Sequence, residues 1–195
     1  MNKGRLEAFS DGVMAIIITI MVLELRPPNS GELSALKPIF PGLVSYILSF
    51  TFVGIYWNNH HHLMQAAKGV NGKILLANMH LLFWLSLTPF CTAWLGETGI
   101  HPWPVALYGM ILLCSAGAYT ILVRALIAHH GEDSLLAKAI GGDLKGYVSL
   151  GIYFTGVLTA FVFPLFAYGL YFLVAVIWLV PDRRIERVLT GPQRD

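Results

Sequence analysis

The hydrophobic positions of this chain gather into long runs rather than into short alternating patterns. A helix needs about 20 apolar residues to cross the hydrocarbon core of a bilayer, and six stretches have roughly that length. Pro164 interrupts the last of these runs, so we expect a tight helical hairpin there. The sequence predicts an all-α membrane protein, a single six-helix transmembrane domain over residues 1–195, with spans at 6–25, 39–60, 74–95, 103–128, 145–163 and 165–181.

Lysine and arginine are distributed unevenly between the segments that connect these spans. With a cytoplasmic N-terminus, only Arg26 and Lys37 fall on the outer side. Because these residues favour the cytoplasmic side, we expect a multi-pass protein of the cell membrane with both termini in the cytoplasm. An even number of spans follows from that. The inner set is Lys3, Arg5, Lys68, Lys73, Arg124, Lys138, Lys145, Arg183, Arg184, Arg187 and Arg194.

The composition supports a membrane protein and excludes several other classes. Of the 195 residues, 56% are hydrophobic and 12% are charged, whereas soluble domains average about 25% charged residues. The net charge of +2 is too small to indicate a nucleic-acid partner. Cys91 and Cys114 both lie inside apolar runs, which favours packing over a disulfide or a redox site.

The first span carries an unusual polar group at its start, in the sequence RLEAFSDGVMAIIITIMVLEL (residues 5–25). At about 100° per residue, Ile16, Ile20 and Leu23 share one stripe, and Phe9 extends it toward the N-terminus. Asp11 falls on roughly the opposite face. Apolar residues surround most of the helix, so periodicity alone does not identify a functional face.

An aspartate within a membrane span needs a partner, because a carboxylate that faces lipid is costly. Asp11 is open to two interpretations, a buried polar clamp between helices or direct ion binding. His80 is the best candidate partner within a span, with Asn78 beside it. We therefore expect Arg5, Asp11 and His80 to form a network that fixes the first helix to its own bundle.

The start of the chain also resembles a known signature. Arg5, Phe9, Ser10 and Asp11 match the Arg-x-x-x-Phe-Ser-Asp motif of the transmembrane protein 175 family of potassium channels, position by position. The sequence NNHHHL after the second span and PF within the third are compatible with the family. At one repeat in length, the chain resembles the prokaryotic members, which assemble as homotetramers.

The resemblance implies a potassium-permeable cation channel in which the first helix of each subunit lines a central pore. It places a hydrophobic gate at Ile16, with Ile20 and Leu23 as further layers, and it assigns potassium preference to Thr19. An apolar constriction closes a pore by expelling water. The implied partners are potassium ions, the lipid bilayer and three further copies of the chain.

The consecutive histidines His60, His61 and His62 raise the question of a metal site. Neighbouring helix positions point about 100° apart, and the i, i+4 spacing of a two-histidine face is missing from this run. We expect no metal and no cofactor, and an interfacial cluster instead.

Two other classes of function are a secondary transporter and an enzyme. A proton-coupled secondary transporter would use Asp11 and His80 as an intramembrane relay. An enzyme has little support, because the sequence offers no nucleophile–base pair, metal spacing or phosphate-binding loop. We therefore expect a channel, with the transporter as the alternative.

Overall fold

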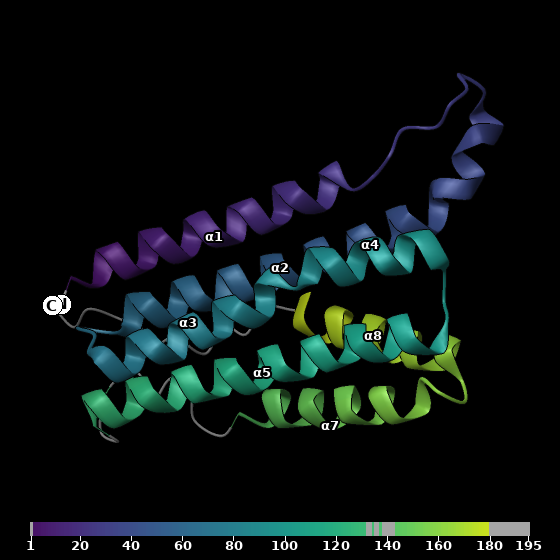
Figure 1. Ribbon diagram of the computed structural model, residues 1–195. Helices are drawn as coiled ribbons and strands as arrows, with labels where there is room; N and C mark the ends of the chain where they lie inside the picture. Colours follow the sequence, from purple (N-terminus) through teal and green to yellow (C-terminus); the bar gives the residue numbers. More distant parts are fainter. Residues whose placement is uncertain (1, 132–133, 135–136, 138–142, 180–195) are drawn as a thin grey trace, which may run out of the picture.

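The computed structural model describes residues 2–131, 134, 137 and 143–179, and these form a bundle of long helices (Figure 1). Within these residues every regular element is helical, as the all-α prediction requires. In chain order they are α1 (Lys3–Leu23), the 3₁₀ helix η1 (Leu33–Ile39), α2 (Phe40–Ala66), α3 (Gly72–Ser86), α4 (Thr88–Thr98), α5 (Pro102–His130), α7 (Leu144–Thr159) and α8 (Pro164–Leu179).

In the part of the chain that the structure describes, four segments are long and apolar enough to cross a membrane, namely Lys3–Leu23, Leu33–Ala66, Gly72–Thr98 and Pro102–His130. Helices α7 and α8 are shorter, with 16 residues each, about 24 Å at 1.5 Å per residue. The predicted fifth span, 145–163, extends past the end of the observed helix, because α7 ends at Thr159. The predicted end of the last span at residue 181 lies outside the described residues.

The expected hairpin between the last two spans is present, and its geometry explains the role of Pro164. A turn follows α7, and Pro164 is the first residue of α8. Proline is favoured at this position because the first helical N–H groups have no partner within the helix and the proline ring presets φ. Pro164 thus begins a helix, and α7 and α8 pack against each other.

The third predicted span, 74–95, is divided into two helices. Helix α3 ends at Ser86 and α4 begins at Thr88, with Leu87 between them. Pro89 is the physical cause, because it has no N–H to donate to the carbonyl one turn earlier. The Leu87 N–H instead bonds to the Trp84 carbonyl at 3.2 Å, as in a tighter turn.

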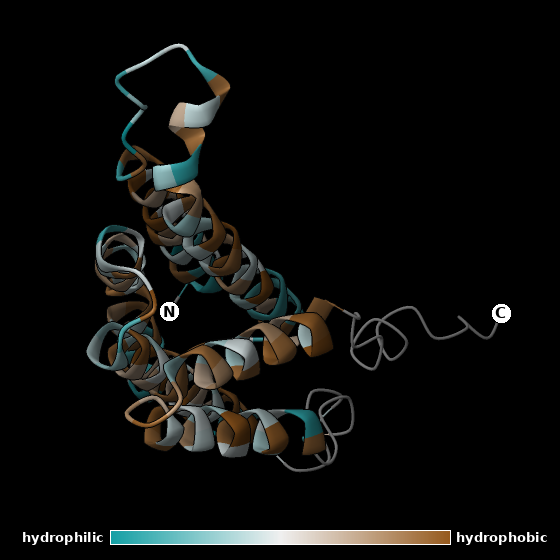
Figure 2. Ribbon diagram, turned by 90° about the vertical axis from the view of Figure 1, so that its right-hand side faces the viewer, coloured by the Kyte–Doolittle hydropathy of each residue, from teal (hydrophilic) through white to brown (hydrophobic). Residues whose placement is uncertain are grey.

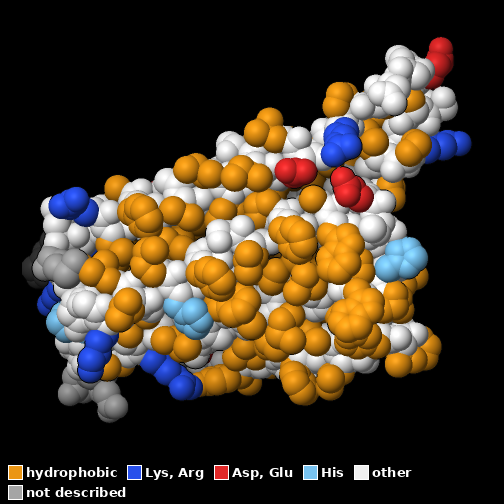
Figure 3. Space-filling model, viewed as in Figure 1, with side chains coloured by type: hydrophobic (Ala, Val, Ile, Leu, Met, Phe, Trp, Pro, Cys, Tyr) orange, Lys and Arg blue, Asp and Glu red, His pale blue; other side chains and the backbone are white. Residues whose placement is uncertain are grey.

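Charged and apolar side chains occupy different parts of the surface. Figure 3 shows hydrophobic side chains across the middle of the face and blue Lys and Arg side chains concentrated at the end where α1 begins. Figure 2 shows hydrophobic residues, in brown, recurring along the helices, and Phe154, Leu158 and Leu165 are more than half exposed. Apolar surface of this extent suits contact with lipid. Lys138 and the arginines after residue 180 lie outside the described residues.

Tyr171 is the tightest packing point of the second half of the bundle. Its ring is fully buried, and its hydroxyl donates to the Val105 carbonyl at 3.3 Å. The ring occupies the space that a Cβ atom would need at Gly109 of α5 and at Gly156 of α7. These two glycines therefore let α5 and α7 approach α8 closely.

We predict that Gly109→Ala and Gly156→Ala each lower the thermal unfolding midpoint of the detergent-purified protein, since overpacking costs about 1–3 kcal/mol. The matched controls are Gly117→Ala on α5 and Gly151→Ala on α7, where a Cβ atom meets nothing within 4 Å. The controls should be neutral or slightly stabilising, because alanine favours helix. Equal midpoints for all four variants would contradict the packing role of Tyr171.

Candidate functional site

Helix α1 lies at the edge of the bundle and presents two distinct faces (Figure 1). Its inner face packs on α2, α3 and α4. The buried residues follow helical spacing and are Leu6, Ser10, Met14, Ile17 and Met21. The opposite side forms an exposed stripe, which we define as Phe9, Ile16, Thr19, Ile20 and Leu23.

The exposed stripe holds every residue predicted for the gate. Ile16, Ile20 and Leu23 are 59%, 41% and 78% exposed, respectively. The hydroxyl of the exposed Thr19 donates to the Ile16 carbonyl at 2.9 Å, so its oxygen can still accept a hydrogen bond or contact a cation. No part of the described chain covers this apolar stripe.

The first half of α1 is fixed to α2 by polar contacts that run in antiparallel register. Near the start of α1, Lys3 Nζ donates to the carbonyl oxygens of Met64 at 2.9 Å and Ala67 at 3.0 Å. These carbonyls belong to the end of α2, where the last C=O groups lack partners within the helix. The ammonium group therefore caps α2 and also aligns the two helices.

Two further pairs continue this register at intervals of one helical turn. Glu7 Oε1 lies 3.4 Å from His61 Nδ1, and Trp57 Nε1 donates to Asp11 Oδ1 at 3.0 Å. The Gln65 amide donates to His61 Nε2 at 2.9 Å, which directs the His61 Nδ1–H toward Glu7. Positions i and i+4 on each helix share one face, so these contacts fix both the rotation and the height of α1.

A buried polar trio, Ser10, Asn78 and His60, joins α1 to α3 and α2. The Asn78 amide donates to Ser10 Oγ at 2.9 Å, and the Ser10 hydroxyl donates to the Leu6 carbonyl at 2.8 Å. Asn78 Oδ1 lies 2.8 Å from His60 Nε2. All three residues of the trio have no exposed surface.

The hydrogen-bond chemistry of the trio also sets the tautomer of His60. A carbonyl oxygen only accepts, so His60 Nε2 carries the proton that it donates to Asn78. His60 Nδ1 then holds a lone pair, and it has no hydrogen-bond partner among the described residues. The two neighbouring histidines thus have separate roles, because His60 contacts α3 whereas His61 contacts Glu7 of α1.

The predicted contact between Asp11 and His80 is wrong. Asp11 accepts from Trp57, and the exposed His80 accepts from Trp84 Nε1 through its own Nε2 at 2.9 Å. The reason is angular, because Asn78 faces α1 and His80 lies two residues, about 200°, further round α3. The alternative function, a proton-coupled transporter, requires a relay between Asp11 and His80, and these two side chains are not in contact.

Arg5 lies outside the anchoring contacts as well. Its side chain is exposed, and it forms no ion pair within the described part of the chain. The sequence analysis missed Trp57 and His60, which do take part. The available signal was the spacing of Trp57 and His61 on α2, which matches that of Glu7 and Asp11 on α1.

Asp11 is half-buried and bonded to Trp57, which fits the clamp interpretation better than direct ion binding. The described residues hold no group of three or more His, Cys, Asp or Glu side chains that could bind a metal ion. The chemistry that this site offers is therefore an apolar stripe with one hydroxyl, on a helix whose back is fixed by hydrogen bonds.

Comparisons with known proteins point to one family. The family model for the endosomal/lysosomal potassium channel TMEM175 matches residues 5–89. A protein of Chryseobacterium sp. (strain P1-3), named as a potassium channel, is 57% identical over 189 residues, covering 97% of this chain and 98% of that protein. The human endosomal/lysosomal proton channel TMEM175 is 35% identical over 96 residues, which are 43% of this chain and 19% of the human protein.

A solved structure agrees with these sequence matches. The crystal structure of a lysosomal potassium-selective channel TMEM175 homolog from Chamaesiphon minutus superposes with a TM-score of 0.79 and 28% sequence identity. The match covers 92% of this chain and 97% of that chain. With a 57% identical relative aligned over nearly its full length, the chain belongs to the TMEM175 family.

Proposed function

We propose that this protein is the subunit of a potassium-permeable channel and that α1 lines its central pore. The observation that carries the proposal is the exposed stripe of α1, which is apolar, uncovered by the rest of the chain, and opposite the anchored face. Bacterial relatives named as potassium channels and the superposed potassium-selective channel homolog support it. The proposal assigns no enzymatic activity to the chain.

The gate in this proposal is a ring of apolar side chains. Ile16 of each subunit forms the first constriction, and Ile20 and Leu23 form further layers one and two turns along. A narrow apolar ring excludes water, and an ion that loses its hydration shell without replacement contacts meets a large barrier. Opening then requires the α1 helices to separate or rotate.

Thr19 supplies the polar group nearest to this constriction. Its hydroxyl already donates to the Ile16 carbonyl at 2.9 Å, so the oxygen presents only acceptor lone pairs to the exposed side. An outward-facing acceptor favours a partly dehydrated cation over an anion. We assign the preference for potassium to this position.

A central pore lined by α1 needs several copies of the chain around one symmetry axis, and we propose a homotetramer. The exposed stripe of one chain runs along α1 from Phe9 to Leu23, so four copies around an axis would enclose a continuous apolar path. The protein would lie in the cell membrane with both termini in the cytoplasm. Lys3 and Arg5 lie in the first turn of α1, and Lys3 bonds to the end of α2, which Lys68 follows and beyond which Lys73 lies in the first turn of α3. Four basic residues at one end of the bundle agree with that orientation.

The polar trio and the contacts with α2 have a defined role in this proposal. They hold the first half of α1 in one rotation, and the rotation decides which side chains face the axis. A turn of one residue, about 100°, would move Ile16 away from the axis. The anchoring contacts therefore preserve the gate even though they do not touch the ion.

We predict that Ile16→Asn raises potassium flux through the closed channel in liposomes, because an amide hydrates the constriction. Lowering the barrier by about 1.4 kcal/mol corresponds to a tenfold increase in rate. The matched control is Ile47→Asn, an isoleucine of α2 that is 52% exposed but lies off the stripe. Saturating, proton-coupled flux that does not respond to Ile16→Asn would contradict the gate and the channel together.

The assembly makes a separate prediction. Native mass spectrometry of the detergent-purified protein should give a mass of about 86 kDa, four times the 21.5 kDa of the chain. A stable species of half that mass, carrying normal flux after reconstitution, would exclude the tetramer.

The trio can be tested through Asn78→Leu, which keeps the side-chain volume but leaves Ser10 and His60 without their partner. A buried group left unsatisfied costs about 1–3 kcal/mol, so we expect a lower unfolding midpoint and altered basal flux. Asn58→Leu on the exposed side of α2 is the matched control. Wild-type stability and flux in Asn78→Leu would show that α1 does not depend on the trio.

A further inference from the structure

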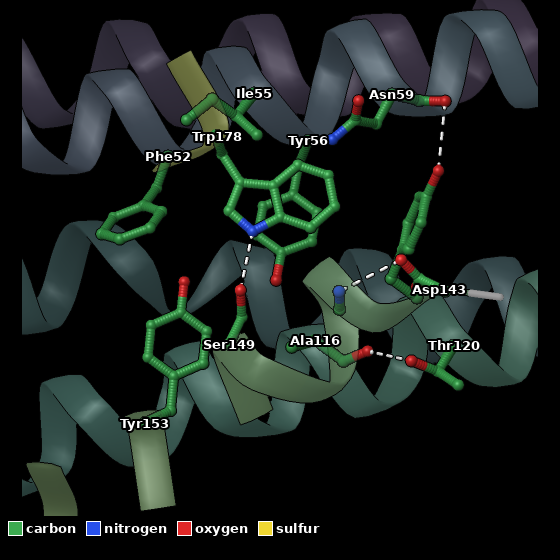
Figure 4. Close-up of a pocket in the computed structure, with 12 residues that line it drawn as sticks. Phe52, Ile55, Tyr56, Asn59, Ala116, Thr120, Asp143, Ser149, Tyr153 and Trp178 are labelled. Carbon is green, nitrogen blue, oxygen red and sulfur yellow. Dashed lines mark hydrogen bonds between the residues drawn. The ribbon is translucent and has the colours of Figure 1, made fainter. Parts of the chain in front are cut away.

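A pocket lies on the far side of α2 from α1, between α2, α5, α7 and α8 (Figure 4). Its empty volume is about 470 Å³, including the open space at its mouth. The residues that line it come from four helices, so it is a feature of the folded bundle. They are Phe52, Ile55, Tyr56, Asn59, Ala116, Tyr119, Thr120, Asp143, Gly146, Ser149, Tyr153 and Trp178.

Two phenol groups in this pocket lack partners. Tyr56 and Tyr153 are 8% and 3% exposed, and neither hydroxyl forms a hydrogen bond within the described residues. Figure 4 shows both hydroxyls directed into the pocket, on either side of Ser149. The enclosed side-chain atoms without a partner in the described residues are His60 Nδ1 and Ser115 Oγ, so both phenol oxygens reach the open space of the pocket. There they can accept a hydrogen bond from a group that enters it.

The polar end of the pocket is acidic. Asp143 caps the start of α7, where its Oδ1 accepts from the Gly146 N–H at 3.1 Å. A carboxylate has about four acceptor sites, so this single bond leaves capacity for another donor. Asn59 and Thr120 line the pocket at the same end, and Tyr119 joins them by donating to the Asn59 carbonyl at 3.2 Å.

The walls of the pocket are aromatic, and one of them already contacts a cation. The Lys145 ammonium group lies 4.9 Å from the centre of the Trp178 ring, an arrangement stabilised by the negative face of the indole. Trp178 is held in place because its Nε1 donates to Ser149 Oγ at 2.8 Å. Phe52 and Tyr153 meet edge to face nearby, with ring centres 6.1 Å apart.

We propose that this pocket binds a small organic ammonium ion whose body is apolar. The ammonium group donates to Asp143 and to the unpartnered phenol oxygens, while the apolar body packs against Phe52, Tyr153 and Trp178. Aromatic faces together with a carboxylate favour a cation of this kind over a neutral molecule of equal size. The pocket uses no residue of α1, so the inference does not rest on the proposed pore.

The test compares benzylamine, which is protonated at neutral pH, with benzyl alcohol, its neutral counterpart. Each is titrated into the purified full-length protein while tryptophan fluorescence is recorded, with Trp178→Phe to identify the reporting residue. We expect benzylamine to bind saturably, benzyl alcohol to bind at least about tenfold more weakly, and the signal to disappear in Trp178→Phe. Equal affinity for the two probes, or a signal that persists without Trp178, would overturn the proposal.

Two variants separate the recognition groups from the fold. Asp143→Asn keeps a good helix cap but removes the charge, and we expect it to weaken benzylamine binding about tenfold with little effect on benzyl alcohol. Tyr153→Phe removes only a hydroxyl and should weaken the amine severalfold. Tyr147→Phe, the same change at an exposed position of α7 outside the pocket, is the control. Unchanged benzylamine affinity in both Asp143→Asn and Tyr153→Phe would refute the assignment.

Discussion

Ser10, Asn78 and His60 form the contact on which the orientation of α1 depends. In a membrane-spanning bundle, a polar group has no water to bond with and must find its partners inside the protein. The Asn78 side chain satisfies Ser10 on one side and His60 on the other, at 2.9 and 2.8 Å. Few rotations of α1 would satisfy these groups together, so the trio selects one face of α1 to be buried and leaves the other exposed.

The two halves of α1 are held by different forces. The first half carries the directional contacts, from Lys3 to Asp11, whereas the second half is held mainly by apolar packing of Met14, Ile17 and Met21. Directional bonds fix rotation and height, and apolar contacts tolerate small shifts because they have no preferred angle. The residues proposed for the gate, at positions 16, 20 and 23, all lie in the half with the less directional support. This distribution suits a helix that is anchored at one end and moves at the other.

The requirement for about 20 apolar residues is a strong and simple constraint, and four segments of the described residues meet it as helices. Sequence-based prediction fails at Leu87, where Pro89 divides a continuous apolar run, and at Thr159, where α7 ends within apolar sequence. Hydropathy is unchanged at both points, so only local backbone chemistry marks them. The two 16-residue helices illustrate the same limit, since apolar composition does not state where a helix stops.

The sequence indicates some features of the candidate site and not others, because it shows the depth of a residue in the membrane but not the rotation of its helix. The exposed stripe followed from helical spacing and the family signature, which together place Ile16, Ile20 and Leu23 on one face. Depth along the spans indicates His80 as a partner for Asp11, but His80 lies at the wrong angle on α3. Membrane depth can be inferred along each span, whereas rotation depends on which neighbour each helix faces. The contact of Trp57 with Asp11 therefore depends on the α1–α2 register, which hydropathy does not give.

Helix α2 lies between α1 and the aromatic pocket, and it contributes residues to the contacts with α1 and to the wall of the pocket. Trp57 and His61 face α1, whereas Tyr56 and Asn59, one or two residues away, line the aromatic pocket on the other side. A ligand in the pocket would change the proposed pore only if it binds one position of α2 more tightly than another. Since the polar contacts tie α2 to the first half of α1, any such displacement would pass to the anchored end of α1 before it reached the proposed gate.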